Sequence, residues 1–387
     1  MDALTARLLL YGDLGQDSIL LRLSGLFADW KAGATPKPVL IRGIYDQIKR
    51  LLDLATAYGF AEDLWQDYLA FLLATNENSF SLITERVGAL EGSVNHFAKA
   101  DFAAFRALFH YDFGPIERDL GIDCFSTIRR YTAIGKHERR YNKNVSDKVR
   151  SLARQLADAP DEEAFFAIVT AHYAAYGVGQ IGLNKAFRIR SGAEGVSLLP
   201  IYNTDKVMLA DLVGYEEQKR QLRANTEAFL AGRPANNVLL YGDAGTGKSS
   251  SVKALINEYY DRGLRMIELY KHQFRDLSTV IAQIKDRNYR FILFLDDLSF
   301  EENEVEYKFL KAVIEGGVET RPENVLLYAT SNRRNLIRET WKDRGDMEHD
   351  NDVHRSDTLE EKLSLSARFG VRIHYGDPNL SQFQQIV

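Results

Sequence analysis

The 387-residue sequence contains little cysteine and proline and has no excess of positive charge. Its single cysteine, Cys124, excludes an internal disulfide or a cluster of thiolate metal ligands, and we interpret it as a small packed side chain. Eight prolines, 45% hydrophobic and 27% charged residues indicate a globular protein rather than a disordered or collagen-like one. The formal net charge of −5 excludes a generally basic surface, so any contact with nucleic acid has to be local.

Long hydrophobic runs are also missing. No apolar stretch approaches the roughly 18 residues needed to span a bilayer, and the N-terminus lacks the basic start of a signal peptide. We therefore expect a cytoplasmic protein without a membrane span. The length of the chain suggests two or three domains.

The first part of the chain has the periodicity of helices. Ile44, Ile48 and Leu51 share one helical face, as do Trp65, Tyr68 and Leu69 in a second stretch. The same spacing recurs at Phe102, Phe105 and Phe109, and at Val149, Leu152 and Leu156, where we take Ser146 as the N-cap. These apolar stripes predict a helical core rather than a cofactor site.

Glycines mark the end of this helical region. Five of them fall between Gly177 and Gly195, so we predict a mostly helical domain over 1–195 with its connection at 177–195. Beyond it, short apolar runs alternate with helical stretches, which predicts an α/β core over 196–380 with a parallel sheet flanked by helices. The five expected strands are 238–241, 266–269, 291–295, 325–329 and 371–374.

A glycine-rich phosphate loop of the form GxxxxGK[ST] follows the first expected strand and precedes a helix, the context that this motif requires. Backbone N–H groups of such a loop bind phosphate oxygens, together with the positive end of the helix. Lys248 would reach the β- and γ-phosphates, and the Ser249 hydroxyl would ligate Mg²⁺. The nucleotide-binding residues expected here are Gly242, Asp243, Ala244, Gly245, Thr246, Gly247, Lys248, Ser249 and Ser250.

Polar residues follow the third and fourth of the expected strands. Asp296 and Asp297 end the strand at 291–295, which resembles a Walker B element. We expect Asp296 to hold Mg²⁺ through water and Asp297 to orient the attacking water. Glutamate is usual at the second position, so Glu301 or Glu302 is an alternative base. Asn332 ends the strand at 325–329, where its amide would sense the γ-phosphate and help to align water.

This order of motifs resembles that of the AAA+ ATPases. The stretch 209–216 is similar to the adenine-side element of that family, in which Val213 and Gly214 would flank the base. The pattern ending Arg368-Phe369-Gly370 resembles the arginine-finger box. The whole chain also resembles a bacterial family of AAA+-type proteins described only as a domain of unknown function, through its helical N-terminal region and the sequences at 296–302 and 329–334.

The resemblance implies a catalytic Arg368 that enters the nucleotide site of a neighbouring subunit, with Arg333 and Arg334 as competing candidates. A homo-oligomeric ring would follow, with a hexamer as one candidate. The family's helical lid, with its second sensor arginine, would begin near 381–387, where this sequence ends. We therefore expect a Mg²⁺-dependent ATPase that remodels or loads an unidentified macromolecule through its N-terminal domain. The alternative is an ATP-gated adaptor with negligible hydrolysis.

Two further signals carry less weight. Eight lysines and arginines between Arg129 and Arg150 could contact nucleic acid, but a solvated helical face or a docking patch for an acidic protein is the favoured interpretation. The acidic stretch 341–361 contains His349 and His354 without a recognised metal-binding spacing, and we interpret it as a loop. A P-loop kinase is disfavoured because it leaves Asn332 and Arg368 unexplained.

Overall fold

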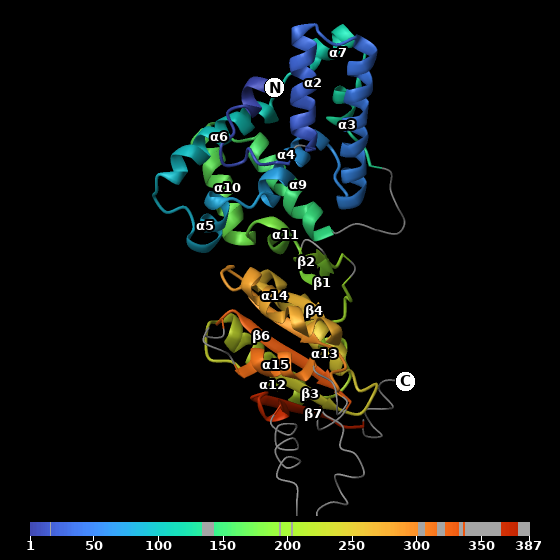
Figure 1. Cartoon of the computed structure of the whole chain (residues 1–387), viewed down its shortest axis with the longest axis vertical. Helices are drawn as coiled ribbons and strands as arrows, with labels where there is room; N and C mark the ends of the chain where they lie inside the picture. Colours follow the sequence, from blue (N-terminus) through green and yellow to red (C-terminus); the bar gives the residue numbers. More distant parts are fainter. Residues whose placement is uncertain are drawn as a thin grey trace, which may run out of the picture. The chain divides into compact units, whose positions relative to one another are not determined.

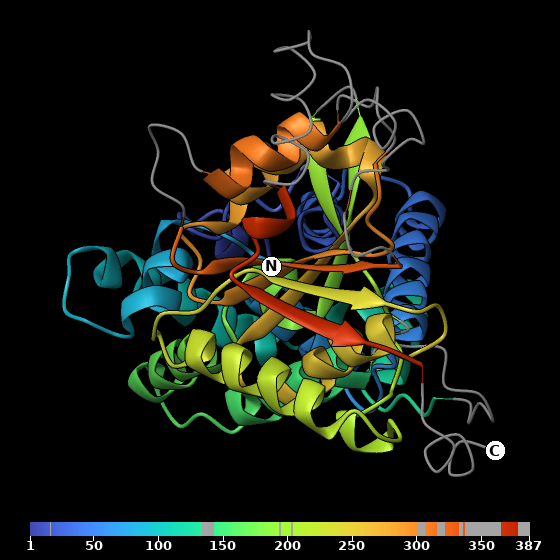
Figure 2. The same cartoon turned by 90° about the horizontal axis from the view of Figure 1, so that it is seen from below.

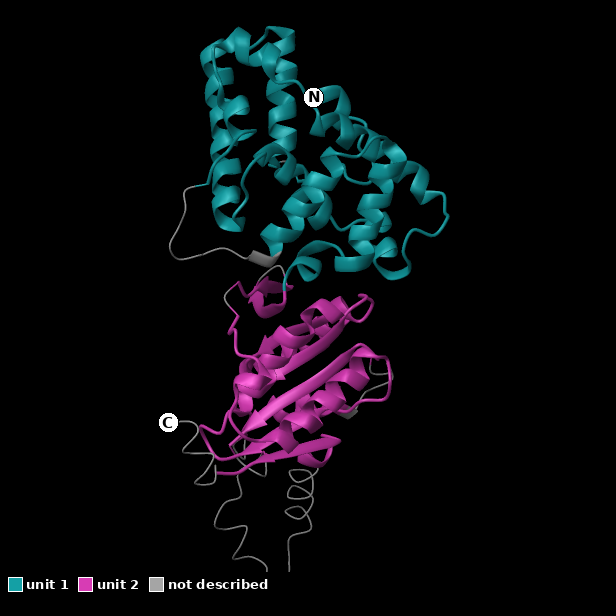
Figure 3. Ribbon diagram, turned by 180° about the vertical axis from the view of Figure 1, so that it is seen from behind, with its two compact units in different colours: residues 1–184 teal, residues 185–387 magenta. Residues whose placement is uncertain are grey.

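The computed structural model describes residues 1–15, 17–133, 143–192, 195–202, 204–300, 306–315, 322–332, 336 and 365–377, without the side chains of 143, 144 and 315. The fold divides into two compact units, Met1–Asn184 and Lys185–Val387 (Figure 3). The division lies inside 177–195, the stretch expected as the connection, rather than at its end. Within the described ranges, no helix is long and apolar enough to cross a membrane.

The first unit is helical in its described part (Figure 1). Ile44, Trp65 and Phe105, taken from three of the predicted stripes, are fully buried in one hydrophobic core. Cys124 packs against the same core, and burial raises the pKa of its thiol to about 11. The helices are α1 (Asp2–Thr5), α2 (Ile19–Ala32), α3 (Lys37–Tyr58), α4 (Leu64–Thr75), α5 (Ser79–Val87), α6 (Val94–Phe109), α7 (Gly114–Leu120), α8 (Cys124–Ile128), α9 (Lys143–Ala157), α10 (Glu162–Tyr176) and α11 (Gly179–Leu183).

Short polar side chains begin several of these helices. Asp63 and Asp161 each accept a hydrogen bond from a backbone N–H in the first turn of the helix that follows, α4 and α10. The predicted N-cap at Ser146 is wrong, because α9 already begins at Lys143. The Ser146 hydroxyl instead donates to Gly59 O at 2.9 Å, so it ties α9 to the end of α3.

The basic stretch of the first unit is partly neutralised where the structure describes it. Arg129 forms an ion pair with Asp63 at 3.0 Å, and Arg150 forms one with Glu62. The ammonium of Lys148 lies over the ring of Tyr176. Lys136, Arg139 and Arg140 lie outside the described residues.

The second unit contains a seven-stranded sheet in the order β2-β1-β4-β5-β6-β3-β7. The predicted α/β fold, with a mostly parallel sheet after a helical region, is confirmed, but the predicted number of five strands is wrong. The two additional strands form an antiparallel pair, and β1 also pairs in parallel with β4. Because they lie within and directly after the glycine-rich stretch, the sequence analysis did not separate them from a linker. The strands are β1 (Ala186–Gly192), β2 (Gly195–Pro200), β3 (Val238–Gly242), β4 (Leu264–Leu269), β5 (Arg290–Leu295), β6 (Val325–Ser331) and β7 (Val371–Tyr375).

Helices cover both faces of this sheet. Leu222 of α12 (Glu216–Leu230) and Leu255 of α13 (Lys248–Tyr259) share a core with Ile292 and Phe294 of β5. Leu293 is buried on the opposite face, because successive side chains of a strand alternate. Figure 2 shows α12 and α15 (Glu306–Glu315) on opposite sides of the sheet. The remaining elements are α14 (Leu277–Ile284) and the short η1 (Leu209–Asp211), η2 (Tyr260–Arg262) and η3 (Lys271–Asp276).

Candidate functional site

The phosphate loop connects the end of β3 to the start of α13. Gly242, Gly245 and Gly247 have φ angles of 136°, 78° and 84°, in a region that side chains disfavour. At Gly242 the restriction is also steric, since a Cβ would lie 1.9 Å from the carbonyl oxygen of Tyr375. The glycines of the motif are therefore required by the backbone of the loop itself.

Lys248 folds back onto this loop. Its side chain is buried, and its ammonium donates to Gly242 O at 3.0 Å and to Asp243 O. Burial lowers the pKa of Lys248, while the nearby carboxylates of Asp243, Asp297 and Asp296 act in the opposite direction. The Thr246 hydroxyl, 3.5 Å away, is a third partner of this ammonium. A buried ammonium that is bound by neutral oxygens of the loop can exchange these partners for phosphate oxygens, which carry full charge.

Ser249 and Asp296 lie side by side. The Ser249 hydroxyl donates to Asp296 Oδ1 at 2.5 Å, and the Thr330 hydroxyl donates to the same oxygen at 2.6 Å. The other carboxylate oxygen of Asp296 lies 3.6 Å from the ammonium of Lys253. The structure thus brings together the two predicted metal-binding residues, and it adds Thr330 and Lys253 as their neighbours.

This pair fits a magnesium ion. Mg²⁺ prefers oxygen ligands, and it is usually held by one or two protein groups together with water and substrate phosphates. Ser249 and Asp296 supply a hydroxyl and a carboxylate oxygen next to the start of α13, beside the loop that would carry the phosphates.

Asp297 and Asn332 are also brought together. The Asn332 amide donates to Asp297 Oδ1 at 3.0 Å, and the backbone N–H of Asp297 donates to Thr330 Oγ1 at 2.9 Å. Asp297 has a φ of 51°, in the left-handed region that aspartate and asparagine enter more readily than longer side chains. This backbone conformation gives a physical reason for aspartate at a position where glutamate is usual.

The order of the strands explains why these residues meet. β6 lies between β5 and β3, with Leu295 opposite Ala329 and Tyr241 opposite Ser331. The three parallel strands therefore end at one edge of the sheet, where Thr330 lies near the end of β6 and where Asp296 and the phosphate loop follow β5 and β3. Sequence analysis missed Thr330 because its role depends on this strand order, although its position two residues before Asn332 was the available signal.

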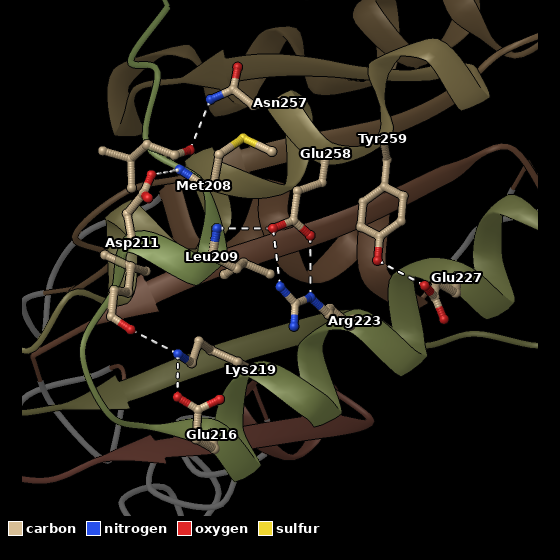
Figure 4. A network of polar contacts seen from close by, with 12 residues as sticks. Met208, Leu209, Asp211, Glu216, Lys219, Arg223, Glu227, Asn257, Glu258 and Tyr259 are labelled. Atoms are coloured by element: carbon tan, nitrogen blue, oxygen red, sulfur yellow. Dashed lines mark hydrogen bonds and ion pairs between the residues drawn. The ribbon is translucent and has the colours of Figure 1, made fainter.

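The predicted adenine-side element, 209–216, is the base-side segment; it begins with η1 and ends at the first residue of α12. Gly214 and Tyr215 within it have φ angles of 76° and 58°. A network of polar contacts holds this part of the chain against α13 (Figure 4). Glu258 accepts from the backbone N–H of Leu209 at 3.0 Å and pairs with Arg223 at 3.2 Å. The buried Lys219 donates to Leu212 O, next to Val213, and pairs with Glu216. These contacts hold Leu209 and Leu212, the residues before Val213 and Gly214, against α13 and α12.

Arg368 lies away from these residues. It precedes β7, whose first residue Val371 is opposite Val238 at the start of β3. The phosphate loop follows Gly242, opposite the last residue of β7. Arg368 and the loop therefore adjoin opposite ends of the same two strands, and β7, which runs from one end to the other, is roughly 13 Å long at the rise of a parallel strand.

Several predicted features fall outside the described residues. These are Glu301 and Glu302 as alternative bases, Arg333 and Arg334 as alternative fingers, the acidic stretch 341–361 and the lid start at 381–387. Among the side chains that the structure does describe, no cluster of three or more histidine, cysteine, aspartate or glutamate residues could hold a metal ion.

Comparisons with known proteins point to one family. The profile of the family described as "Protein of unknown function (DUF815)" matches residues 183–387, which agrees with the resemblance noted from the sequence. The replication factor C large subunit of Staphylothermus marinus is 41% identical over 68 residues, or 17% of this chain and 15% of that protein's length.

Solved structures give weaker matches. The RuvB Holliday junction branch migration motor of Thermotoga maritima has a TM-score of 0.32 and 17% identity, over 47% of this chain and 52% of that one. DnaI has a TM-score of 0.30 and 21% identity, over 45% of this chain and 89% of that one.

Proposed function

We propose that this chain, which belongs to the family of proteins of unknown function DUF815, binds ATP with Mg²⁺ and hydrolyses it in the manner of an AAA+ ATPase. The observation that carries the proposal is the direct contact between Ser249 of the phosphate loop and Asp296 at the end of β5. A glycine-rich turn that served only as a connection would not need an acidic partner from another strand.

The residues of the loop would bind the phosphates. The N–H groups around Gly245 and Gly247 and the positive end of α13 suit a polyphosphate chain, and the Lys248 ammonium would leave the carbonyl oxygens of Gly242 and Asp243 for it. Ser249 and Asp296 would hold Mg²⁺, which neutralises charge on the phosphates when it is bound. Val213 and Gly214 would lie beside the adenine.

Asp297 and Asn332 would act on the attacking water. The Asp297 carboxylate can accept a proton or hydrogen bond from that water, and the Asn332 amide, 3.0 Å from it, can donate to a phosphate oxygen. Their mutual hydrogen bond supports a shared task, since each group fixes the orientation of the other.

The position of Arg368 supports the proposal that the chain assembles into an oligomer. Because it lies at the end of the sheet away from its own phosphate loop, it would reach a nucleotide only in a neighbouring subunit. An arginine supplied in this way stabilises charge on the transferred phosphoryl group. We propose a homo-oligomer in which each site is completed by the next subunit, with a hexamer as one candidate.

The second candidate function is an ATP-gated switch that hydrolyses negligibly. It is favoured by Asp297, whose carboxylate is one methylene shorter than glutamate and is already bound by Asn332. Steady-state phosphate release, measured over a range of protein concentrations with Mg²⁺ and with a chelator, separates the two functions. Turnover that rises with protein concentration, requires Mg²⁺ and falls in Asp297→Asn supports the ATPase. Tight ATP binding with no turnover at any concentration supports the switch.

We also propose that the helical unit recognises a macromolecular partner, because it has a hydrophobic core of its own, separate from that of the ATP site. Its basic residues at Arg129 and Arg150 are paired with acidic ones, which favours a protein over nucleic acid. Removal of residues 1–184 should leave ATP binding intact, and loss of ATP binding in residues 185–387 would argue against the separation.

A further inference from the structure

Tyr375 lies outside the proposed nucleotide-binding residues and is joined by hydrogen bonds to both ends of the phosphate loop. This residue ends β7 and lies opposite Gly242. Its carbonyl oxygen accepts from Asp243 N at 3.0 Å. Its hydroxyl donates to Ser251 Oγ at 3.0 Å, and Ser251 Oγ donates to Gly247 O at 2.8 Å. Tyr375 thus contacts the first peptide of the loop through its carbonyl oxygen. Its hydroxyl is linked to the last peptide through the side chain of Ser251.

The geometry of the peptide unit gives these contacts a consequence at the end of the loop. The C=O and N–H of a trans peptide point in opposite directions. Gly247 O accepts bonds from both the backbone N–H and the hydroxyl of Ser251. The N–H of Lys248, on the same peptide, is therefore turned away from Ser251, as binding of a phosphate oxygen requires.

The first peptide of the loop is oriented in the same way. The N–H of Asp243 is used by Tyr375 O, so the carbonyl of Gly242 on that peptide points the other way. There it accepts from the Lys248 ammonium at 3.0 Å. Tyr375 therefore orients both the peptide that holds the lysine and the peptide whose N–H faces the ligand.

The side chain of Tyr375 is itself held firmly. It is buried, and its ring stacks on that of Tyr215 with 4.9 Å between centroids. The Tyr215 hydroxyl donates to Gly376 O at 2.7 Å. Burial raises the pKa of Tyr375 to about 12, so its hydroxyl remains a neutral donor at physiological pH. Because Tyr215 follows Gly214, this stack also connects the base-side segment with the phosphate loop.

We propose that Tyr375 is a positioning residue that sets the conformation of the phosphate loop through its hydroxyl bond to Ser251. The effect of this bond on ATP affinity rests on the proposed function, whereas its effect on the loop does not. Tyr375→Phe removes the bond and keeps the stacked ring. Ser251→Ala removes the acceptor of the same bond.

The affinity test is a double-mutant cycle with a matched control. We expect Tyr375→Phe and Ser251→Ala each to weaken ATP binding about five-fold. The double variant should bind ATP no more weakly than either single variant, because both substitutions remove the same bond. Tyr328 is the control, because it is also a buried tyrosine of this sheet, with its hydroxyl bonded to Asn225 and Thr226 at 2.9 Å. Tyr328→Phe should lower stability without changing ATP affinity. Unchanged affinity in Tyr375→Phe, or additive effects in the double variant, would overturn the proposal.

A second measurement does not depend on nucleotide. Amide hydrogen exchange of Asp243 and Ser251, whose N–H groups donate to Tyr375 O and Gly247 O, should be faster in the ligand-free Tyr375→Phe variant than in Tyr328→Phe. Equal exchange in the two variants would overturn the positioning role. If the unaltered chain binds no ATP, the proposed function fails, and the exchange comparison alone decides whether Tyr375 positions the loop.

Discussion

Thr330 Oγ1 lies 2.6 Å from Asp296 Oδ1 and donates a hydrogen bond to it. Thr330 Oγ1 also accepts a hydrogen bond from the backbone N–H of Asp297 at 2.9 Å. One buried hydroxyl therefore orients two successive aspartates for which we propose different tasks, metal binding and water activation. Replacing it should disturb both tasks at once.

Thr330→Val keeps the shape of the side chain and removes its hydrogen bonds, which leaves the N–H of Asp297 without this partner. We expect turnover to fall about ten-fold, because a lost hydrogen bond to a charged group is worth about 1.5–3 kcal/mol. The Mg²⁺ concentration for half-maximal activity should rise as well. Thr330→Ser keeps the hydroxyl and should retain most of the activity, so equal losses in both variants would contradict this role.

Asp297→Asn is suited to test water activation, because asparagine accepts the left-handed backbone at this position. We predict that ATP binding is unchanged while turnover falls by about 10²–10⁴, the range typical of a lost general base. Single-turnover phosphate release, compared with nucleotide titration of the same sample, measures both quantities. A turnover rate equal to that of the unaltered protein would exclude Asp297 as the base.

Arg368→Ala should reduce turnover by about 10³–10⁵ if the arginine completes a neighbouring site. Mixing this variant with Lys248→Ala should restore part of the activity, since a mixed oligomer contains sites with an intact loop beside an intact arginine. Arg220→Ala, which removes an exposed arginine of the same unit, is the control. Failure of the mixture to recover activity would argue against a site shared between subunits.

Asp67 gives the helical unit a pH-dependent stability. The residue is only 4% exposed, its Oδ2 has no hydrogen-bond partner among the described residues, and burial raises the pKa of its carboxyl group to about 7. The native state therefore keeps a proton that the unfolded state, with its pKa near 3.8, releases. It follows that the free energy of unfolding decreases as the pH rises from about 4 to about 7.

Asp67→Asn should remove this dependence. At roughly 1.4 kcal/mol per pKa unit, the difference in the free energy of unfolding between the variant and the unaltered protein should change by up to about 4 kcal/mol between acid and neutral pH. Urea unfolding at about pH 4 and pH 8 measures it. Stability curves that run parallel over this range would show that the carboxyl titrates normally.

The sequence was sufficient to predict the elements and motifs that are local along the chain. The loop before Lys248, the strand before Asp296 and the buried helical stripes follow from spacing within a few residues. β1 and β2 were missed because they adjoin the glycines of the expected connection, with Gly192 ending β1 and Gly195 beginning β2. Ser146 was misassigned because a cap depends on where the helix begins.

The partners of the site could not be predicted from the sequence. Thr330 and Tyr375 act through neighbouring strands, and nothing local shows that β6 separates β5 from β3 or that β7 pairs with β3. Lys253 was overlooked for a related reason, since its contact with Asp296 joins a helix to a strand that is distant in the sequence.

The central claim is that the phosphate loop binds the triphosphate of ATP, and calorimetric titration with MgATP tests it most directly. We predict a saturable heat for the unaltered chain and a much weaker one, or none, for Lys248→Ala. No heat for the unaltered chain, or equal affinity in the two proteins, would contradict the claim.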